Sequence, residues 1–207
     1  MKLKVCGMKF PSNIIEIESL NPDFMGFIFW NKSVRYYDKT SISISNKIKR
    51  VGVFVNESFE EVLRKIKQYD LDYIQLHGEE DKDYCKKIKD YCKIIKVFSI
   101  SEKFSFDNLE SFENLCHYFL FDTKSKSYGG SGEKFDWKIL NNYNSKKPFF
   151  LSGGIDVSDF GEIKKIINLK IPLIGIDINS KFEIKPGFKD CKKVQKLIKK
   201  MKNENFL

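Results

Sequence analysis

The chain alternates short apolar runs with longer segments in which apolar residues recur at helical spacing. Segments 57–69, 79–92 and 189–201 each place apolar residues on one face and polar residues on the other, which predicts helices that pack against a sheet. Eight runs rich in β-branched and aromatic residues predict strands. They read LKVC near residue 3, FMGFIF near 24, VGVFV near 51, YIQLH near 73, IIKVF near 94, YFLFD near 118, FFLSG near 149 and LIGIDI near 173.

This alternation favours parallel strands joined by right-handed helical crossovers. The chain has 207 residues and no long linker, so we expect one domain over residues 1–207, folded as a closed (β/α)8 TIM barrel of the α/β class. The alternative is an open doubly wound sheet. Such a sheet usually carries a G-x-G-x-x-G turn after its first strand, whereas the turn here reads CGMKFPS.

Composition narrows the class of protein further. With 42% hydrophobic and 31% charged residues, the chain is too apolar for a disordered protein, and no apolar run reaches the roughly 20 residues of a membrane span. Five cysteines, at spacings typical of neither zinc sites nor disulfide frameworks, favour the cytoplasm. The net charge of +9 raises the alternative of a nucleic-acid-binding protein, but the lysines are spread over nearly every predicted helix, which favours a solvated surface.

In a (β/α)8 barrel, functional groups gather where the strands end. The predicted strands end at four reactive side chains, which are Cys6, His77, Asp122 and Asp177. Glycine-rich loops follow the sixth and seventh strands, reading SYGGSGEK and SGGI. Exposed amides in such loops bind phosphate, so we expect a phosphorylated small molecule as the ligand.

Cys6 differs from the other cysteines in its predicted surroundings. Strand alternation places Lys4 and Cys6 on the inner face of the first strand, where a cationic neighbour would favour the thiolate and lower the thiol pKa. The others match apolar positions of predicted helices, with Cys85 and Cys92 on one face of segment 79–92, and we expect them to pack in the core. These are Cys85, Cys92, Cys116 and Cys191.

Seven segments, in order and covering nearly the whole chain, resemble those of the phosphoribosylanthranilate isomerases of tryptophan biosynthesis. They read KVCGM, GFIFWNKSVRY, VGVFVN, IQLHGEE, DTKSKSYGGSGEKFDW, LSGGI and GIDINSKFEIKPGFKD. The resemblance implies a small (β/α)8 enzyme. Its reaction would be the Amadori rearrangement of N-(5-phosphoribosyl)anthranilate to 1-(2-carboxyphenylamino)-1-deoxyribulose 5-phosphate. No metal and no cofactor would be required.

The resemblance also implies roles for individual residues. Asp122 would be the acid that protonates the ring oxygen, and Cys6 the base that removes the C2 proton. Arg35 would bind the anthranilate carboxylate, and Asp177 would lie near the anthranilate ring, while His77 is a candidate substrate contact from its strand-end position. The phosphate would lie on a set of turn residues, namely Gly130, Ser131, Gly132, Gly153, Gly154, Asn179 and Ser180.

Two places depart from the family pattern. The chain has Asn179, Ser180 and Lys181 where family members usually have Ser-Ser-Gly, so a backbone conformation with positive φ would be hindered, and Lys181 could contact phosphate or point outward. Lys9 stands where threonine is common and could likewise reach phosphate or solvent.

Two rival functions remain from the sequence. One is the nucleic-acid-binding protein, and the other is a different phosphosugar barrel, such as an epimerase with metal-binding histidines. With only His77 and His117 in the chain, that metal site cannot be assembled as usually built. The sequence is compatible with a monomer or a homodimer.

Overall fold

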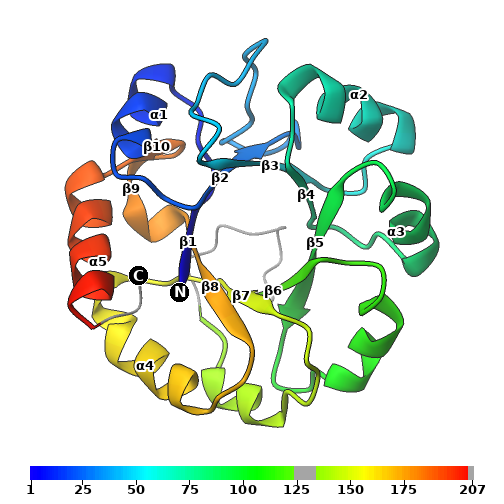
Figure 1. Ribbon diagram of the computed structural model, residues 1–207, viewed down its shortest axis with the longest axis vertical. Helices are drawn as coiled ribbons and strands as arrows, with labels where there is room; N and C mark the ends of the chain where they lie inside the picture. The colour runs from blue at the N-terminus through cyan, green and yellow to red at the C-terminus, as the bar shows by residue number, and fades with distance from the viewer. Residues whose placement is uncertain (124–133, 205–207) are drawn as a thin grey trace.

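The structure, a computed structural model, describes residues 1–123 and 134–204, and eight parallel strands form a closed barrel at its centre (Figure 1). Neighbouring strands follow the order of the sequence, and β1 pairs with β8 so that Lys4 lies opposite Asp177. The predicted (β/α)8 barrel is therefore confirmed. The strands are β1 (Lys2–Val5), β2 (Phe24–Ile28), β3 (Lys49–Phe54), β4 (Tyr73–Leu76), β5 (Lys93–Ile100), β6 (Tyr118–Thr123), β7 (Phe149–Leu151) and β8 (Leu173–Ile178).

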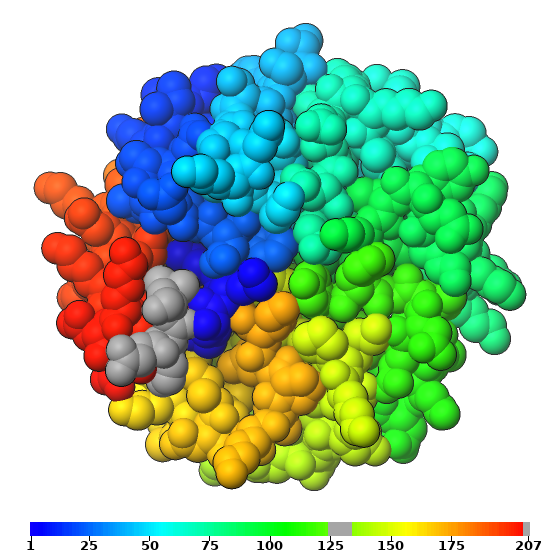
Figure 2. All heavy atoms as spheres, in the orientation of Figure 1, coloured from blue at the N-terminus to red at the C-terminus, as the bar shows by residue number. Residues whose placement is uncertain are grey.

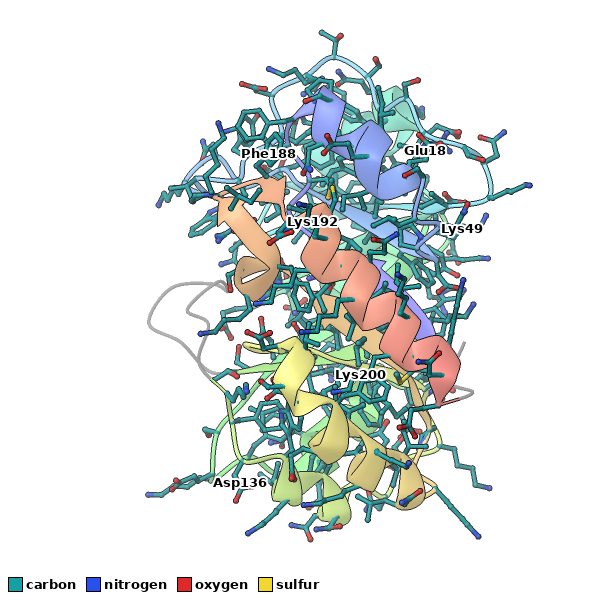
Figure 3. The ribbon with its side chains drawn as sticks, turned by 90° about the vertical axis from the view of Figure 1, so that its left-hand side faces the viewer. Glu18, Lys49, Asp136, Phe188, Lys192 and Lys200 are labelled. Atoms are coloured by element: carbon teal, nitrogen blue, oxygen red, sulfur yellow. The ribbon has the colours of Figure 1, made fainter. Side chains whose placement is uncertain are left out.

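Helices surround the barrel, and the apolar face of each predicted helix faces inward. In α5, the buried residues are Val194, Leu197, Ile198 and Met201, while Lys192 and Lys200 lie on the outer side of the helix (Figure 3). Side-chain caps define the starts of α2, α3 and α5, where Ser58, Asp81 and Asp190 accept hydrogen bonds from the first turn. The α-helices are α1 (Pro11–Glu18), α2 (Phe59–Tyr69), α3 (Lys82–Ile88), α4 (Phe160–Asn168) and α5 (Cys191–Asn203).

Not every crossover is an α-helix. Residues 29–48, between β2 and β3, contain no helix, which suits a segment rich in serine and other poor helix formers. In two further crossovers the described residues form short 3₁₀ helices, η1 (Phe106–Phe112) and η2 (Trp137–Asn142). The prediction for Cys92 was wrong in detail. Because α3 ends at Ile88, Cys92 lies in the turn before β5 and not on a helix face.

The other cysteine predictions agree with the packing. Cys85 and Cys116 are buried in the core between the barrel and the helices, and Cys92 and Cys191 pack against its edge. All five cysteines are free thiols.

A separate apolar cluster fills the inside of the barrel. Four of its rings contact one another edge to face or stacked, with centroids 5.3 Å apart for Phe24 and Phe150 and 5.8 Å apart for Tyr73 and Tyr118. On the face that carries the N-terminus, atoms fill the centre of the ring (Figure 2). The barrel is thus closed at the end that carries the N-terminus. Two inward positions further along the strands face the opposite mouth, namely Gln75 after Tyr73 and Asp122 after Leu120.

A small hairpin follows β8 and was not expected from the sequence. The 3₁₀ turn η4 (Ser180–Phe182) leads into β9 (Glu183–Lys185), which pairs antiparallel with β10 (Phe188–Lys189) just before α5. Within residues 1–123 and 134–204, none of the helices is long and apolar enough to cross a membrane.

Candidate active site

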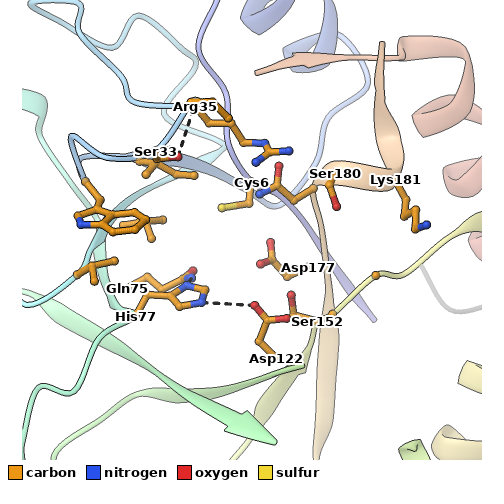
Figure 4. A pocket seen from close by; sticks show the side chains of 18 of the residues that line it. Cys6, Ser33, Arg35, Gln75, His77, Asp122, Ser152, Asp177, Ser180 and Lys181 are labelled. Carbon is orange, nitrogen blue, oxygen red and sulfur yellow. Dashed lines mark hydrogen bonds and ion pairs between the residues drawn. The ribbon is translucent and has the colours of Figure 1, made fainter. Parts of the chain in front are cut away.

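A polar pocket opens at the carboxyl ends of the strands, the end at which (β/α)8 enzymes act. Figure 4 shows side chains from most of the strand ends pointing into this one space. It is lined by Cys6, Ile28, Trp30, Lys32, Ser33, Val34, Arg35, Val53, Val55, Gln75, His77, Asp122, Ser152, Gly153, Gly154, Ile155, Asp177, Asn179, Ser180 and Lys181. All predicted site residues that the structure describes are in this set, whereas Gly130, Ser131 and Gly132 lie outside the described residues.

Cys6 lies directly after β1 at the base of the pocket. Its backbone N–H donates a hydrogen bond to the carbonyl oxygen of Ile178 in β8 over 2.9 Å, which holds the start of the loop against the barrel. Gly26 on the neighbouring strand leaves room for the thiol, because a Cβ there would lie only 2.7 Å from Sγ of Cys6. The thiol therefore occupies a space made by both strands.

Lys4 points into the barrel as predicted, and it is fully buried. Its Nζ donates to Oδ1 of Asp177 over 2.8 Å, across the β1–β8 pairing. Burial opposes the charge on Lys4, but the Asp177 carboxylate and Cys6 together outweigh burial, so the pKa of Lys4 is raised above its ordinary value. Lys4 is thus a charged residue with a dedicated partner beneath the pocket.

The predicted lowering of the Cys6 thiol pKa was wrong. Burial raises the pKa of Cys6 above its ordinary value, and the lowering effect of Lys4 is smaller. The physical reason is that Lys4 is paired with Asp177, whose carboxylate itself acts on Cys6 in the raising direction. Cys6 is therefore a thiol in the resting site and becomes a comparatively strong base once deprotonated.

Each carboxylate oxygen of Asp122, in β6, has a different neighbour. Its Oδ1 accepts the N–H of Thr123 over 2.8 Å, while its Oδ2 lies 3.4 Å from Nε2 of His77 (Figure 4). His77 is in turn oriented by Gln75, whose Nε2 lies 2.9 Å from Nδ1 of the ring. If Gln75 donates to Nδ1, a neutral ring carries its proton on Nε2, facing Asp122.

The glycine turn after β7 has the backbone that the phosphate prediction needs. Gly153 and Gly154 adopt φ values of +90° and +61°, and a Cβ on Gly153 would lie 2.3 Å from Oγ1 of Thr123. Only glycine fits this close approach without displacing the neighbouring strand. The turn therefore brings bare backbone to the pocket wall.

The turn after β8 does not need a glycine. Asn179 has a φ of −145°, and neither Ser180 nor Lys181 is among the described residues with positive φ. The expected conflict between the sequence Asn-Ser-Lys and the backbone is therefore absent. Lys181 lines the pocket, whereas Lys9 is directed to the loop after β2, where its Nζ donates to the carbonyl of Val34 over 3.1 Å.

Arg35 reaches the pocket from the loop after β2, and its guanidinium has a partner that the sequence did not suggest. Its Nε donates to both oxygens of Glu183, over 2.9 and 3.0 Å, and its Nη2 donates to Oε2 over 2.7 Å. Glu183 begins the hairpin strand β9. Local patterning could not reveal this pair, because 148 residues separate the partners and a charged hairpin looks like solvated surface.

No three histidine, cysteine, aspartate or glutamate side chains within residues 1–123 and 134–204 lie close enough to hold a metal ion. The pocket instead combines a buried thiol, a carboxylate beside a histidine, and a guanidinium. These groups can transfer protons and bind anions. Together with the closed parallel barrel, they place the protein in the class of (β/α)8 enzymes that act on small anionic molecules at the strand ends.

Comparison with known proteins gives the family. The sequence profile described as N-(5'phosphoribosyl)anthranilate (PRA) isomerase matches residues 3–200. An N-(5'-phosphoribosyl)anthranilate isomerase from Phocaeicola vulgatus is 42% identical over 206 residues, which cover 99% of each chain. The chain belongs to the N-(5'-phosphoribosyl)anthranilate isomerase family of tryptophan biosynthesis.

Solved structures agree with this assignment. Phosphoribosyl anthranilate isomerase from Thermotoga maritima matches with a TM-score of 0.83 and 29% identity, over 98% of this chain and 99% of the other. A phosphoribosyl anthranilate isomerase in complex with reduced 1-(o-carboxyphenylamino)-1-deoxyribulose 5-phosphate matches with a TM-score of 0.79 and 26% identity, over 98% and 99% of the two chains.

Proposed function

We propose that this member of the family converts N-(5'-phosphoribosyl)anthranilate into 1-(2-carboxyphenylamino)-1-deoxyribulose 5-phosphate, with Asp122 as the general acid and Cys6 as the general base. The observation that supports the assignment is that both side chains line one pocket with Arg35, each directly at a strand end. Placed acids and bases each accelerate proton transfer by roughly 10²–10⁴-fold.

The reaction begins with the proton on Asp122. Its Oδ2 is the oxygen not held by Thr123, so it is the atom available to protonate the ring oxygen of the ribose. As that proton moves, the bond between C1 and the ring oxygen breaks, and the nitrogen lone pair forms a C=N⁺ bond to C1. His77, 3.4 Å from Oδ2, is placed to stabilise the carboxylate that remains.

Cys6 then acts on the open-chain cation as the thiolate, after its thiol has released its proton to solvent. Its sulfur removes the proton from C2, and the electron pair of the C–H bond forms a C1=C2 bond while the C=N⁺ bond becomes a neutral amine. The resulting enol returns to a ketone by moving its hydroxyl proton to C1. Asp122 regains a proton from solvent and Cys6 releases the one it removed, so atoms and charge balance over the whole cycle. The positive charge of the open-chain intermediate lies next to the thiol and favours the thiolate. This effect offsets the raised pKa that burial gives Cys6 in the resting site.

Arg35 and the turn residues bind the two ends of the substrate. In this proposal the guanidinium of Arg35 binds the anthranilate carboxylate, with Asp177 nearby, and the phosphate lies on the backbone of Gly153, Gly154, Asn179 and Ser180. The amides of Gly130, Ser131 and Gly132 complete the proposed phosphate site. Binding both anionic ends holds the reacting carbons between Cys6 and Asp122.

The experiment is a turnover assay with purified protein. Phosphoribosylanthranilate is generated in situ from anthranilate and the activated ribose phosphate, and the loss of its fluorescence is followed. Borohydride reduction of the product should yield the reduced 1-(o-carboxyphenylamino)-1-deoxyribulose 5-phosphate that binds the structural relative. Decay at the uncatalysed rate, or a different reduced product, would contradict the proposed function.

We propose further that the enzyme works in the cytoplasm, which the five free thiols support, and that it is a monomer or a homodimer. A structurally similar isomerase from Thermotoga maritima is described as dimeric. The surface lysines then serve solubility, and we expect no salt-sensitive binding of DNA or RNA.

A further inference from the structure

Three charged groups meet beside the pocket in an arrangement that the proposed reaction does not use directly. Glu183 accepts the hydrogen bonds of Arg35 described above, and its Oε1 also accepts from Nζ of Lys189 over 2.7 Å and from the N–H of Gly187 over 3.0 Å. Lys189 is fully buried, and the Glu183 side chain nearly so. One carboxylate thus binds two cations, of which Lys189 is shielded from water and Arg35 reaches the pocket.

The hairpin that carries these groups is anchored to the barrel periphery. Asn13, buried in α1, accepts the backbone N–H of Lys189 over 2.6 Å, and its Nδ2 donates to the Lys189 carbonyl over 3.0 Å. This clamp fixes the backbone of Lys189, whose side chain is fully buried. Buried charges of this kind are rare and costly, so their retention points to a use.

The charges of the cluster do not cancel. Two cations, Arg35 and Lys189, share one anion, Glu183, so the cluster carries a net charge of +1. Burial lowers the pKa of Lys189 to about 8, against the opposing effect of Glu183, so Lys189 remains mostly charged near neutral pH. The opposing cations hold the pKa of Glu183 below its ordinary value although burial alone would raise it. Without Lys189, Glu183 would neutralise Arg35 and the corner would lose its attraction for an anion.

Arg35 keeps one part of its guanidinium free for a ligand. Its Nε and Nη2 are taken by Glu183, and among residues 1–123 and 134–204 no group accepts a hydrogen bond from Nη1. Glu183 therefore fixes the plane of the guanidinium and leaves its remaining donors available at the pocket wall.

Lys189 also orients Asn179. Its Nζ donates to Oδ1 of Asn179 over 2.6 Å, and because an ammonium can only donate, the amide oxygen must face the lysine. The two N–H donors of the amide are thereby turned away from Lys189, on a side chain that lines the pocket. Asn179 is one of the positions at which the sequence departs from the family pattern.

We propose that Glu183 and Lys189 are positioning residues that prepare Arg35 for the carboxylate on the aromatic ring of the substrate. Glu183 orients the guanidinium. Lys189 restores the positive charge that Glu183 removes, and Lys189 also directs the amide donors of Asn179 toward the pocket. This inference rests on the proposed function, in which Arg35 binds that carboxylate.

The test compares two ligands that differ only in that carboxylate. One is reduced 1-(o-carboxyphenylamino)-1-deoxyribulose 5-phosphate, and the other is the same compound without the carboxyl group, with affinities measured by calorimetry. Lys189→Met should weaken binding of the carboxylated ligand by on the order of tenfold or more, and binding of the other compound much less. With the natural substrate, KM should rise while kcat changes little, because ground state and transition state lose the same contact.

The matched control is Lys185→Met, in the same hairpin. It removes the same charge, but Lys185 is exposed, and its ammonium lies over the rings of Phe10 and Phe188. We expect it to bind both ligands like the wild type. Lys189→Gln is the second variant, because it keeps a hydrogen-bond donor in the buried position if Lys189→Met folds poorly, and it should show the same selective loss.

An equal loss of affinity for both ligands in the Lys189 variants would overturn the inference, since it would indicate a purely structural role. If the wild type binds the carboxylated ligand much more tightly than the other compound, and the Lys189 variants show the same preference, this inference alone is overturned. Wild type that binds neither ligand would overturn the proposed function, and this inference with it.

Discussion

Gly7 makes the space in which two pocket-lining side chains meet, and its replacement by alanine should affect both stability and binding. The residue follows Cys6 with a φ of +71°. A Cβ at this position would lie 2.6 Å from Oδ1 of Asn179 and 2.9 Å from Cδ of Arg35. Both distances are shorter than side chains tolerate, so the neighbours would have to move.

The cost of Gly7→Ala has two parts. A left-handed backbone costs alanine about 1–2 kcal/mol, and crowding in a well-packed site typically costs about 1–3 kcal/mol. Lower entropy of the unfolded chain returns about 0.4–1 kcal/mol. The free energy of unfolding should therefore fall by about 2–3 kcal/mol, and KM should rise because Arg35 and Asn179 lose their positions.

Urea unfolding and steady-state turnover measure the two effects. Gly161→Ala in α4 is the matched control, because nothing lies within 4 Å of a Cβ there and its φ is not positive. It should be neutral or stabilising by up to about 1 kcal/mol, with unchanged KM. A Gly7→Ala enzyme as stable and as active as wild type would refute the account of this corner.

Two further predictions concern the base of the pocket. Burial raises the thiol pKa of Cys6, so the thiolate absorbance that distinguishes wild type from Cys6→Ser should appear with a pH midpoint above the ordinary cysteine pKa range of about 8–9. Lys4→Met should shift this midpoint to still higher pH. A wild-type midpoint near pH 7 would contradict the prediction. Lys4→Met leaves Asp177 buried without its cation, so the free energy of unfolding in urea should fall by about 3–5 kcal/mol. Lys2→Met on the same strand breaks a partly exposed 3.6 Å pair with Asp23 and a cation–π contact with the ring of Phe24, and should cost about 1 kcal/mol. Equal losses in the two variants would count against a special role for the buried pair.

The barrel was predictable because each strand contains a short apolar run, within which a polar residue at an inward position stands out. Lys4 and Asp122 could be recognised for that reason, as polar residues at inner positions of apolar strands. Helix boundaries were less predictable. The periodic pattern of segment 79–92 continues past Ile88, but the chain must turn there to enter β5 at Lys93.

The electrostatics of the site required the structure. The alternation of β1 reveals that Lys4 neighbours Cys6, but not that Asp177 of β8 neutralises Lys4 and leaves burial to set the thiol pKa. Glu183 and Lys189 look like surface charges on either side of a Pro-Gly turn. Only the antiparallel pairing of β9 with β10 brings them together beside Arg35, and no local pattern encodes that contact.

The central claim is that Cys6 and Asp122 carry the two proton transfers, and single-turnover rates with phosphoribosylanthranilate test it most directly. Cys6→Ala and Asp122→Asn should each slow the reaction by roughly 10²–10⁴-fold. The controls are Cys191→Ala and Asp90→Asn, which change the same residue types outside the pocket and should react at the wild-type rate. A near-wild-type rate in Cys6→Ala or in Asp122→Asn, with folding intact, would contradict the role given to that residue.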